Sequence, residues 1–232
     1  MVPPMTLRVR LLTEFIGTFV FFTVIALTGL VGALAPIAIG TALTAVVYMG
    51  GHVSGAHYNP AVSFGLFLRG VISTSTMLAY WIAQILAGLT AFAFGFAISG
   101  HTPGIQPGTG VNWYSALAAE TVFTMALVLV VLNVAATRQT AGNSYYGIAI
   151  GFTIAAGAFV AGPISGAAFN PAVGVCATFV GVLFGHGSWS DLWLYVVGPL
   201  AGAAIAAGVH LTQTRGTPVP LEVAESQTPR SR

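Results

Sequence analysis

Two asparagines with the same residues after them are the clearest candidates for chemistry: Asn59-Pro60-Ala61 and Asn170-Pro171-Ala172. Asparagine is favoured just before a helix, because its side-chain oxygen accepts a backbone N–H of the first turn. Proline suits the first helical position, so each tripeptide predicts a helix start. The side-chain amide nitrogen still carries N–H donors. We therefore expect two donors beside two helix N-termini, a site that orients a polar molecule rather than one that breaks bonds.

The two tripeptides belong to a duplication of the whole chain. Ile37-Ala38-Ile39-Gly40 matches Ile148-Ala149-Ile150-Gly151, and Ser54-Gly55-Ala56 matches Ser165-Gly166-Ala167. The spacing is constant, since 148 − 37, 165 − 54 and 170 − 59 all equal 111. Equal offsets over three segments indicate a tandem repeat. A tripeptide that would be weak evidence alone is therefore strong evidence here.

Composition places the chain in a membrane. Hydrophobic residues make up 56% and charged residues only 5%, whereas about a quarter of the residues of a soluble domain are charged. Six apolar runs approach the length of about 20 residues that a bilayer requires. They cover residues 11–30, 35–49, 76–98, 115–134, 146–160 and 192–211. Two more runs, 60–67 and 171–182, follow the asparagines and are too short to cross.

These runs predict an all-α integral membrane protein with six transmembrane helices and two re-entrant half-helices. Positive residues favour the cytoplasmic side of a membrane. Every positive residue is an arginine, and all lie in segments that would share one side: Arg8, Arg10, Arg69, Arg138, Arg215, Arg230 and Arg232. We therefore expect both termini to be cytoplasmic, in the cell (inner) membrane. Three spans per repeat is an odd number, so the tandem repeat is inverted.

The domain prediction follows from the repeat. Residues 1–211 form a single channel domain, with repeat one at 8–100 and repeat two at 112–211. Residues 212–232 contain several prolines and glutamates and predict a disordered cytoplasmic tail.

An inverted repeat brings the two half-helices together from opposite faces. Their N-termini meet near the bilayer centre, so the positive ends of both helix dipoles face one point and repel cations. A water molecule held there by both asparagines interrupts a proton wire. The exposed backbone of the loops at 51–58 and 162–169 is tolerable at membrane depth only where it lines a wet cavity. We infer a pore.

At these residues the chain resembles the major intrinsic protein family, the aquaporins and aquaglyceroporins. The resemblance extends over residues 11–211. Besides the Asn-Pro-Ala pair, it includes Thr13-Glu14-Phe15-Ile16-Gly17-Thr18, Ala83-Gln84, Ala119-Glu120 and Gly198-Pro199. The resemblance implies a passive channel with one pore per subunit, assembled as a homotetramer in the lipid bilayer.

The same resemblance assigns a selectivity filter to four residues: Ile39, Ala158, Ala167 and Val173. A water-selective member would carry an aromatic residue, a histidine, a small residue and an arginine there. None of the four side chains is polar. Loss of the arginine removes a fixed positive charge and five N–H donors. We expect a wide apolar filter that passes water and small uncharged solutes such as polyols and urea.

The replacement of arginine by valine is similar to two branches of the family. One comprises plant tonoplast channels that pass urea, ammonia and peroxide. The other comprises bacterial channels of arsenic-resistance operons, which pass arsenite and methylated arsenicals. Gly174 stands where glycerol facilitators usually carry aspartate, so ordinary glycerol facilitation is not favoured. The sequence leaves the physiological solute open.

Four further polar residues have expected roles. Glu14 and Glu120 occupy matching places in the repeats, and we expect each carboxylate to brace its loop by accepting N–H groups. The alternative is a proton relay, because ionisable groups inside membranes are often functional. His52 and His57 flank the first loop and are expected at the pore mouth, where His57 either packs against the loop or lines the pore.

Three classes of function remain open. A passive channel explains the motifs best. A proton-coupled secondary transporter also uses inverted repeats and could use Glu14 and Glu120, while a junctional or scaffold membrane protein would need adhesive outer loops. An enzyme is not expected, because no nucleophile, base and orienting group converge. We also expect no cofactor, no metal site and no nucleic-acid partner.

Overall fold

The computed structural model describes residues 5–101, 104–184 and 187–215, and every regular element in these ranges is helical. Six helices within these ranges are long and apolar enough to cross a membrane, which confirms the predicted fold class. They are α1 (Leu7–Ala26), α2 (Ala35–Ser54), α4 (Thr74–Ser99), α5 (Trp113–Ala135), α6 (Tyr146–Ser165) and α8 (Leu194–Gln213). Two shorter helices, α3 (Pro60–Leu68) and α7 (Pro171–Leu183), begin at the two prolines.

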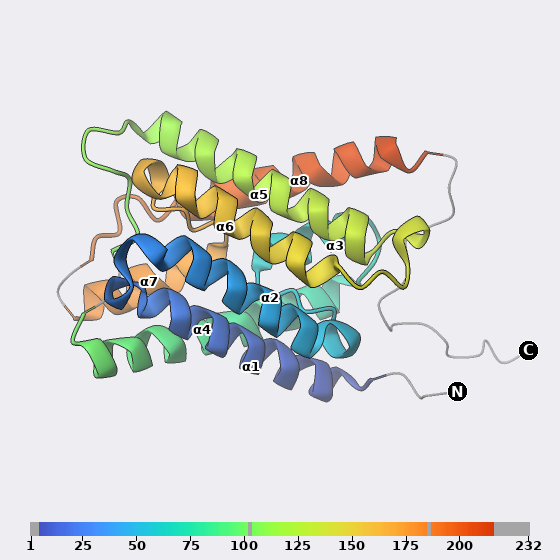
Figure 1. Ribbon diagram of the computed structural model, residues 1–232, viewed down its shortest axis with the longest axis horizontal. Coiled ribbons are helices and arrows are strands. Elements are labelled where there is room, and N and C mark those ends of the chain that lie inside the picture. Colours follow the sequence, from blue (N-terminus) through green and yellow to red (C-terminus); the bar gives the residue numbers. More distant parts are fainter. Residues whose placement is uncertain (1–4, 102–103, 185–186, 216–232) are drawn as a thin grey trace, which may run out of the picture.

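The helices form one bundle in which the short helices occupy opposite halves (Figure 1). The first turn of α1 and the last turn of α8 lie at the same end of this bundle, on the right of the view. The half-helix α3 lies toward that end, and α7 lies toward the other end. Such an arrangement is what two repeats of opposite orientation produce.

Several helix ends differ from the hydropathy pattern. Helix α1 begins early, where the Thr6 side chain accepts the Val9 N–H, and it ends at Ala26 before two 3-10 turns, Thr28–Leu30 and Gly32–Leu34. Helices α2 and α6 continue to Ser54 and Ser165, where Gly55 (φ 88°) and Gly166 (φ 85°) end them in the left-handed conformation. Hydropathy misses these last turns because they are less apolar than the rest of each helix.

The predicted tail also begins too early. Helix α8 continues through Gln213, so residues 212 and 213 are helical rather than disordered. Residues 216–232 of the predicted tail lie outside the described residues.

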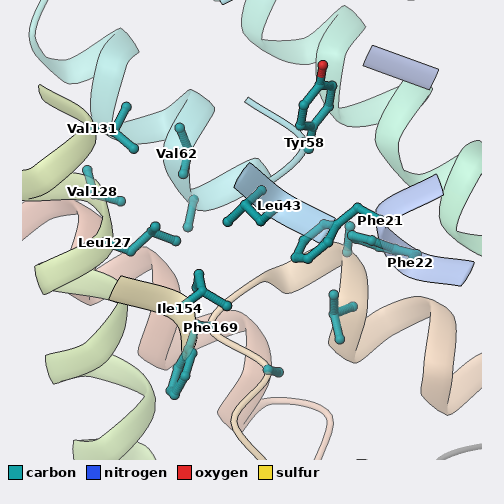
Figure 2. Packing of buried hydrophobic residues seen from close by; sticks show 14 of the residues in the cluster. Phe21, Phe22, Leu43, Tyr58, Val62, Leu127, Val128, Val131, Ile154 and Phe169 are labelled. Atoms are coloured by element: carbon teal, nitrogen blue, oxygen red, sulfur yellow. The ribbon is translucent and has the colours of Figure 1, made fainter. Parts of the chain in front are cut away.

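Each half-helix packs against a long helix of the other repeat. Helix α3 contacts α8, and α7 contacts α4, in addition to contacts within each repeat. The pairs α1–α4 and α5–α8 correspond to each other, and α2 packs directly on α6 between them. The two repeats therefore share one core, to which both contribute apolar side chains from helices and loops (Figure 2).

Helices α2 and α6 cross at two matching glycines of the repeats. A Cβ on Gly40 would lie 2.7 Å from the Gly151 carbonyl oxygen, and a Cβ on Gly151 would overlap the Gly40 carbonyl oxygen and the Thr44 hydroxyl. In a membrane, helices associate largely through close packing, which small residues allow. The Ile-Ala-Ile-Gly repeat thus marks the line where the two halves meet.

The tight crossing predicts that alanine substitution at two glycines will affect stability differently. Gly151→Ala should lower the free energy of unfolding by about 1–3 kcal/mol, because the added methyl overpacks the contact. Gly208→Ala is the control, since no atom lies within 4 Å of its Cβ position in α8 and alanine favours a helix over glycine. Thermal unfolding of the purified protein in detergent measures both. Equal midpoints for the two variants would contradict a tight α2–α6 crossing.

Candidate functional site

The two asparagines cap their own half-helices. The Asn59 Oδ1 atom accepts the Ala61 N–H at 2.8 Å, and Asn170 Oδ1 accepts the Ala172 N–H at 3.0 Å. Both asparagines have extended backbones, and both are buried. The helix starts therefore form as the sequence predicts, with proline as the next residue of each.

The same side chains also join the two repeats. Asn59 Nδ2 donates to the Phe169 carbonyl oxygen at 2.9 Å, and Asn170 Nδ2 donates to the Tyr58 carbonyl oxygen at 3.0 Å. A side-chain amide nitrogen has two hydrogens, so each asparagine has a second N–H beyond this contact. These second N–H groups are the donors that a passing molecule can use.

The loops before the asparagines hold a costly backbone conformation. Four residues with side chains have positive φ values between 48° and 53°: Ala56, Tyr58, Ala167 and Phe169. Such angles are uncommon for residues other than glycine, and each costs on the order of 1–3 kcal/mol. The loops persist because other groups fix them.

Glu14 fixes the first loop. Its Oε1 atom accepts the Ser54 hydroxyl at 2.6 Å and the His57 backbone N–H at 2.9 Å. Its Oε2 atom accepts the Tyr58 backbone N–H at 2.8 Å and the Gln84 amide at 2.9 Å. The side chain is completely buried, so these donors replace the water that a carboxylate would otherwise bind.

Glu120 has the matching place in the second loop. Its Oε1 atom accepts the Ser165 hydroxyl at 2.6 Å and the Ala168 N–H at 3.1 Å, and its Oε2 atom accepts the Phe169 N–H at 2.7 Å. Both carboxylates thus lie where the bracing hypothesis places them. Each satisfies backbone N–H groups of a loop at membrane depth.

A cavity of about 170 Å³ lies between the repeats, with both asparagines in its wall. One buried water needs only about 10–15 Å³, so several fit. Among the described residues, five polar side chains and no charged one line it: Thr28, His57, Tyr58, Asn59 and Asn170. The remaining side chains of the wall are mostly aliphatic, from α1, α2, α3, α5, α6 and α7. The cavity can therefore hold neutral polar molecules but offers a fixed charge to none.

Further cavities adjoin the central one, and two of them lie toward opposite ends of the bundle. A cavity of about 280 Å³ shares Val131 and Ile150 with it and lies at the end of the bundle where α1 begins. A cavity of about 640 Å³ shares Thr28 and Gly104 with it and lies at the opposite end. These three cavities thus follow one another along the axis of the bundle.

Three of the four predicted filter residues lie in the central wall: Ile39, Ala167 and Val173. Ala158 does not. Helix α6 instead contributes Ile150 and Ile154, and Ala158 is buried one turn beyond Ile154. The wall is apolar as expected, but its α6 side carries isoleucine, which is bulkier than the expected alanine.

The two predicted histidines are in different places. His57 is buried in the central wall beside Asn59, with Nδ1 2.9 Å from the Ser63 hydroxyl oxygen, so it is deeper than the expected pore mouth. His52 is exposed and lines the adjoining cavity at the end where α1 begins. Of the two, only His52 lies toward an opening of the bundle.

Sequence reasoning missed part of the wall. Gly104 and Ile105, from the segment between α4 and α5, also line the central cavity. The Gly108 N–H donates to the Ile164 carbonyl oxygen at 3.1 Å, which holds this segment against the end of α6. The segment has no periodic pattern and no charge, so only its glycines and prolines indicated a loop.

Comparison with known proteins decides the family. The family model described as "Major intrinsic protein" matches residues 4–210. The chain belongs to the major intrinsic protein family. Because members of this family are channels, the protein is a multi-pass membrane channel for water and small solutes and not an enzyme.

Individual relatives of this family agree over most of the chain. Identity is 35% over 215 residues with "Probable aquaporin TIP1-1" of Oryza sativa subsp. japonica, covering 86% of this chain and 84% of that one. Identity is 36% over 212 residues with "Aquaporin NIP1-4" of the same organism, covering 86% and 75%. The X-ray structure of the aquaglyceroporin from Plasmodium falciparum has a TM-score of 0.75 at 22% identity, covering 88% of this chain and 96% of that one, which shows a shared fold.

The bracing contacts predict unequal effects of two kinds of substitution. Glu14→Ala leaves four donors without their acceptor and Glu120→Ala leaves three, at about 1–3 kcal/mol for each buried donor. Both should therefore impair folding, Glu14→Ala more severely. Glu→Gln keeps an accepting oxygen and should retain most water flux. Thermal unfolding and flux in proteoliposomes measure these effects, and a Glu→Gln variant that is stable yet inactive would point to proton coupling.

Proposed function

We propose that this channel passes water together with small uncharged solutes, including polyols and urea, through an apolar filter. The observation that carries the proposal is the wall at Ile39, Ala167 and Val173, where no side chain is polar. Apart from water and backbone, a solute in this cavity can hydrogen-bond only to its few polar side chains, among them the two asparagines and His57. An ion would lose much of its hydration there without compensation, so neutral molecules are favoured.

The apolar side chain of Val173 makes trivalent arsenic compounds further candidate solutes. At neutral pH, arsenite is mainly the uncharged hydroxide, whose three hydroxyl groups resemble those of a small polyol. Val173 is 1% exposed and lies in the cavity wall three residues after Asn170, so its side chain adds neither charge nor donors to the path. Arsenite and methylated arsenicals are therefore candidate solutes of the same pore.

The width of the filter is a separate part of the proposal. The expected width depended on Ala158, whereas the α6 wall carries Ile154. The filter is proposed to be apolar, with a size limit set by aliphatic side chains from α2, α6 and α7. Solutes should therefore be separated by cross-section more than by their hydrogen-bonding groups.

We further propose a homotetramer in the cell (inner) membrane, with both termini in the cytoplasm. The described arginines support this orientation, because α1 begins, α3 and α5 end and α8 ends at the same end of the bundle (Figure 1). Arg8, Arg69, Arg138 and Arg215 lie at these helix ends. Clustered positive charge at one end is the pattern of a cytoplasmic face.

The alternative of a proton-coupled transporter lacks an observation in its favour. Neither Glu14 nor Glu120 lies in the wall of the described cavities, and the oxygens of both accept hydrogen bonds from loop residues. No contact of the described residues favours a junctional or scaffold role either. The passive channel remains the proposal.

Proteoliposomes test the solute range directly. Stopped-flow light scattering should show faster flux of water and of small uncharged polyols, urea or trivalent arsenic hydroxide than in protein-free liposomes of the same lipid. The physical reason is that an apolar wall without charge does not discriminate against neutral solutes that fit. Water flux with no movement of any of these solutes would contradict the proposal.

Val173→Arg tests the filter position. The guanidinium would add bulk, charge and donors at the wall, so flux of larger neutral solutes should fall several-fold while water flux falls less. Val173→Leu is the matched control that adds bulk without charge, and the difference between the two variants isolates the charge. Parent rates for large solutes in both variants would show that Val173 does not line the constriction.

A further inference from the structure

Arg10 is a buried cation that the pore described above does not use. Its side chain lies in α1 and is 3% exposed, and it is the one buried arginine among the described residues. The Nε–H group donates to the Tyr80 hydroxyl oxygen at 2.8 Å. The guanidinium carbon lies 5.3 Å from the centre of the Tyr80 ring, within the range of a cation–π contact. The fold thus holds a full positive charge inside the bundle.

Tyr80 connects this charge to the pore. Its ring meets the His57 ring edge-on with centroids 5.0 Å apart, and His57 lines the central cavity. The two distances place the guanidinium carbon no more than about 10 Å from the His57 ring. Tyr80 is fully buried, so little water screens the charge along this line.

The second repeat contains the same frame, a buried tyrosine whose hydroxyl donates to a serine carbonyl oxygen, but it has no arginine beside it. The Tyr80 hydroxyl donates to the Ser54 carbonyl oxygen at 2.7 Å, and the Tyr195 hydroxyl donates to the Ser165 carbonyl oxygen at 2.6 Å. Arg10 stands four residues before Glu14, whereas Ala116 stands four residues before Glu120.

Because the second loop keeps its geometry beside Ala116, the frame itself does not require an arginine. The structural role of the frame and the charge of Arg10 can therefore be separated.

We propose that Arg10 excludes cations from the channel by its electric field at the level of His57. It does not contact solute, because its charge acts through space across the buried Tyr80 ring. The positive ends of α3 and α7 repel cations at the asparagines, and Arg10 adds a full charge on the side of the first repeat. Glu14, one turn along α1, makes this charge more important, since its carboxylate would attract cations if Arg10 were neutral.

The test compares neutral and charged substitutions in proteoliposomes. Arg10→Gln and Arg10→Met remove the charge, Arg10→Lys keeps it, and Arg8→Gln is the control because Arg8 is an exposed arginine at the start of the same helix. Proton and sodium leak, measured with internal dyes, is normalised to water permeability. A unit charge at this distance changes an ion's energy enough for roughly a tenfold change in leak at an effective dielectric constant of about 20. The two neutral variants should show this rise, with Arg10→Lys and Arg8→Gln at the parent level.

Tyr80→Phe separates the field from the hydrogen bond. It removes the phenol that Arg10 binds but keeps the charge, so its normalised leak should stay near that of the parent. A leak equal to that of Arg10→Gln would overturn the proposal, as would a leak in Arg10→Lys equal to that in Arg10→Gln. Both results would mean that the bonded guanidinium matters as structure.

The choice of substitutions at Arg10 controls for misfolding of the variants. Arg10→Met replaces a buried charge by an apolar side chain of similar length, a change that proteins often tolerate. Loss of assembly in every Arg10 variant, Lys included, would make the role structural and overturn the proposal. Parent-level leak in a neutral variant with normal water flux would also overturn it.

The inference rests on the proposed channel function. Measurements on the parent protein distinguish failure of the channel proposal from failure of the Arg10 proposal. A parent that moves neither water nor neutral solute would refute the channel proposal. A parent that conducts water, with neutral variants that remain as tight to cations, would refute only the role of Arg10.

Discussion

The structure depends on one constraint: backbone N–H and C=O groups at membrane depth must find partners inside the protein. Two loops cannot meet this constraint through helical hydrogen bonds, because neither is part of a helix. Each loop has a buried carboxylate as its acceptor, Glu14 or Glu120, and an asparagine of the other repeat as a donor to one of its carbonyls. The remaining polar backbone of the loops can then face a wet cavity.

This arrangement explains why an otherwise apolar channel has its polar groups where it does. The Gly40–Gly151 crossing brings α2 and α6 into backbone contact, so the space between the repeats is left to the loops and to aliphatic side chains. The half-helices point their positive ends at the same space. In the proposed function, selection for neutral solutes therefore results from the backbone and from burial, with few polar side chains required.

Much of this could be predicted from the sequence because the evidence is local. Proline after asparagine fixes a helix start, and the equal offsets fix the pairing of the repeats, so the fold and the capping residues followed from pattern alone. Ala167 and Val173 lie three residues on either side of Asn170, within the geometry that this cap imposes. Both accordingly lie in the cavity wall.

Other parts of the site depend on packing that the sequence does not display. Ala158 is separated from Asn170 by the end of α6 and a loop, and the rotation of α6 depends on neighbours such as the Phe123–Phe169 ring pair and Gly40. Ile105 belongs to an aperiodic segment whose position is set by a backbone contact to Ile164. The relation of Arg10 to His57 passes through Tyr80, seventy residues further along the chain.

The reciprocal bonds of the two asparagines have an architectural consequence. Residue Asn59 reaches the second loop and Asn170 reaches the first by the same contact, which is the geometry of an isologous interface. The two repeats thus meet through a pseudo-symmetric interface within one polypeptide. Each asparagine donor finds its acceptor in the other repeat, and the central cavity is lined by residues of both repeats.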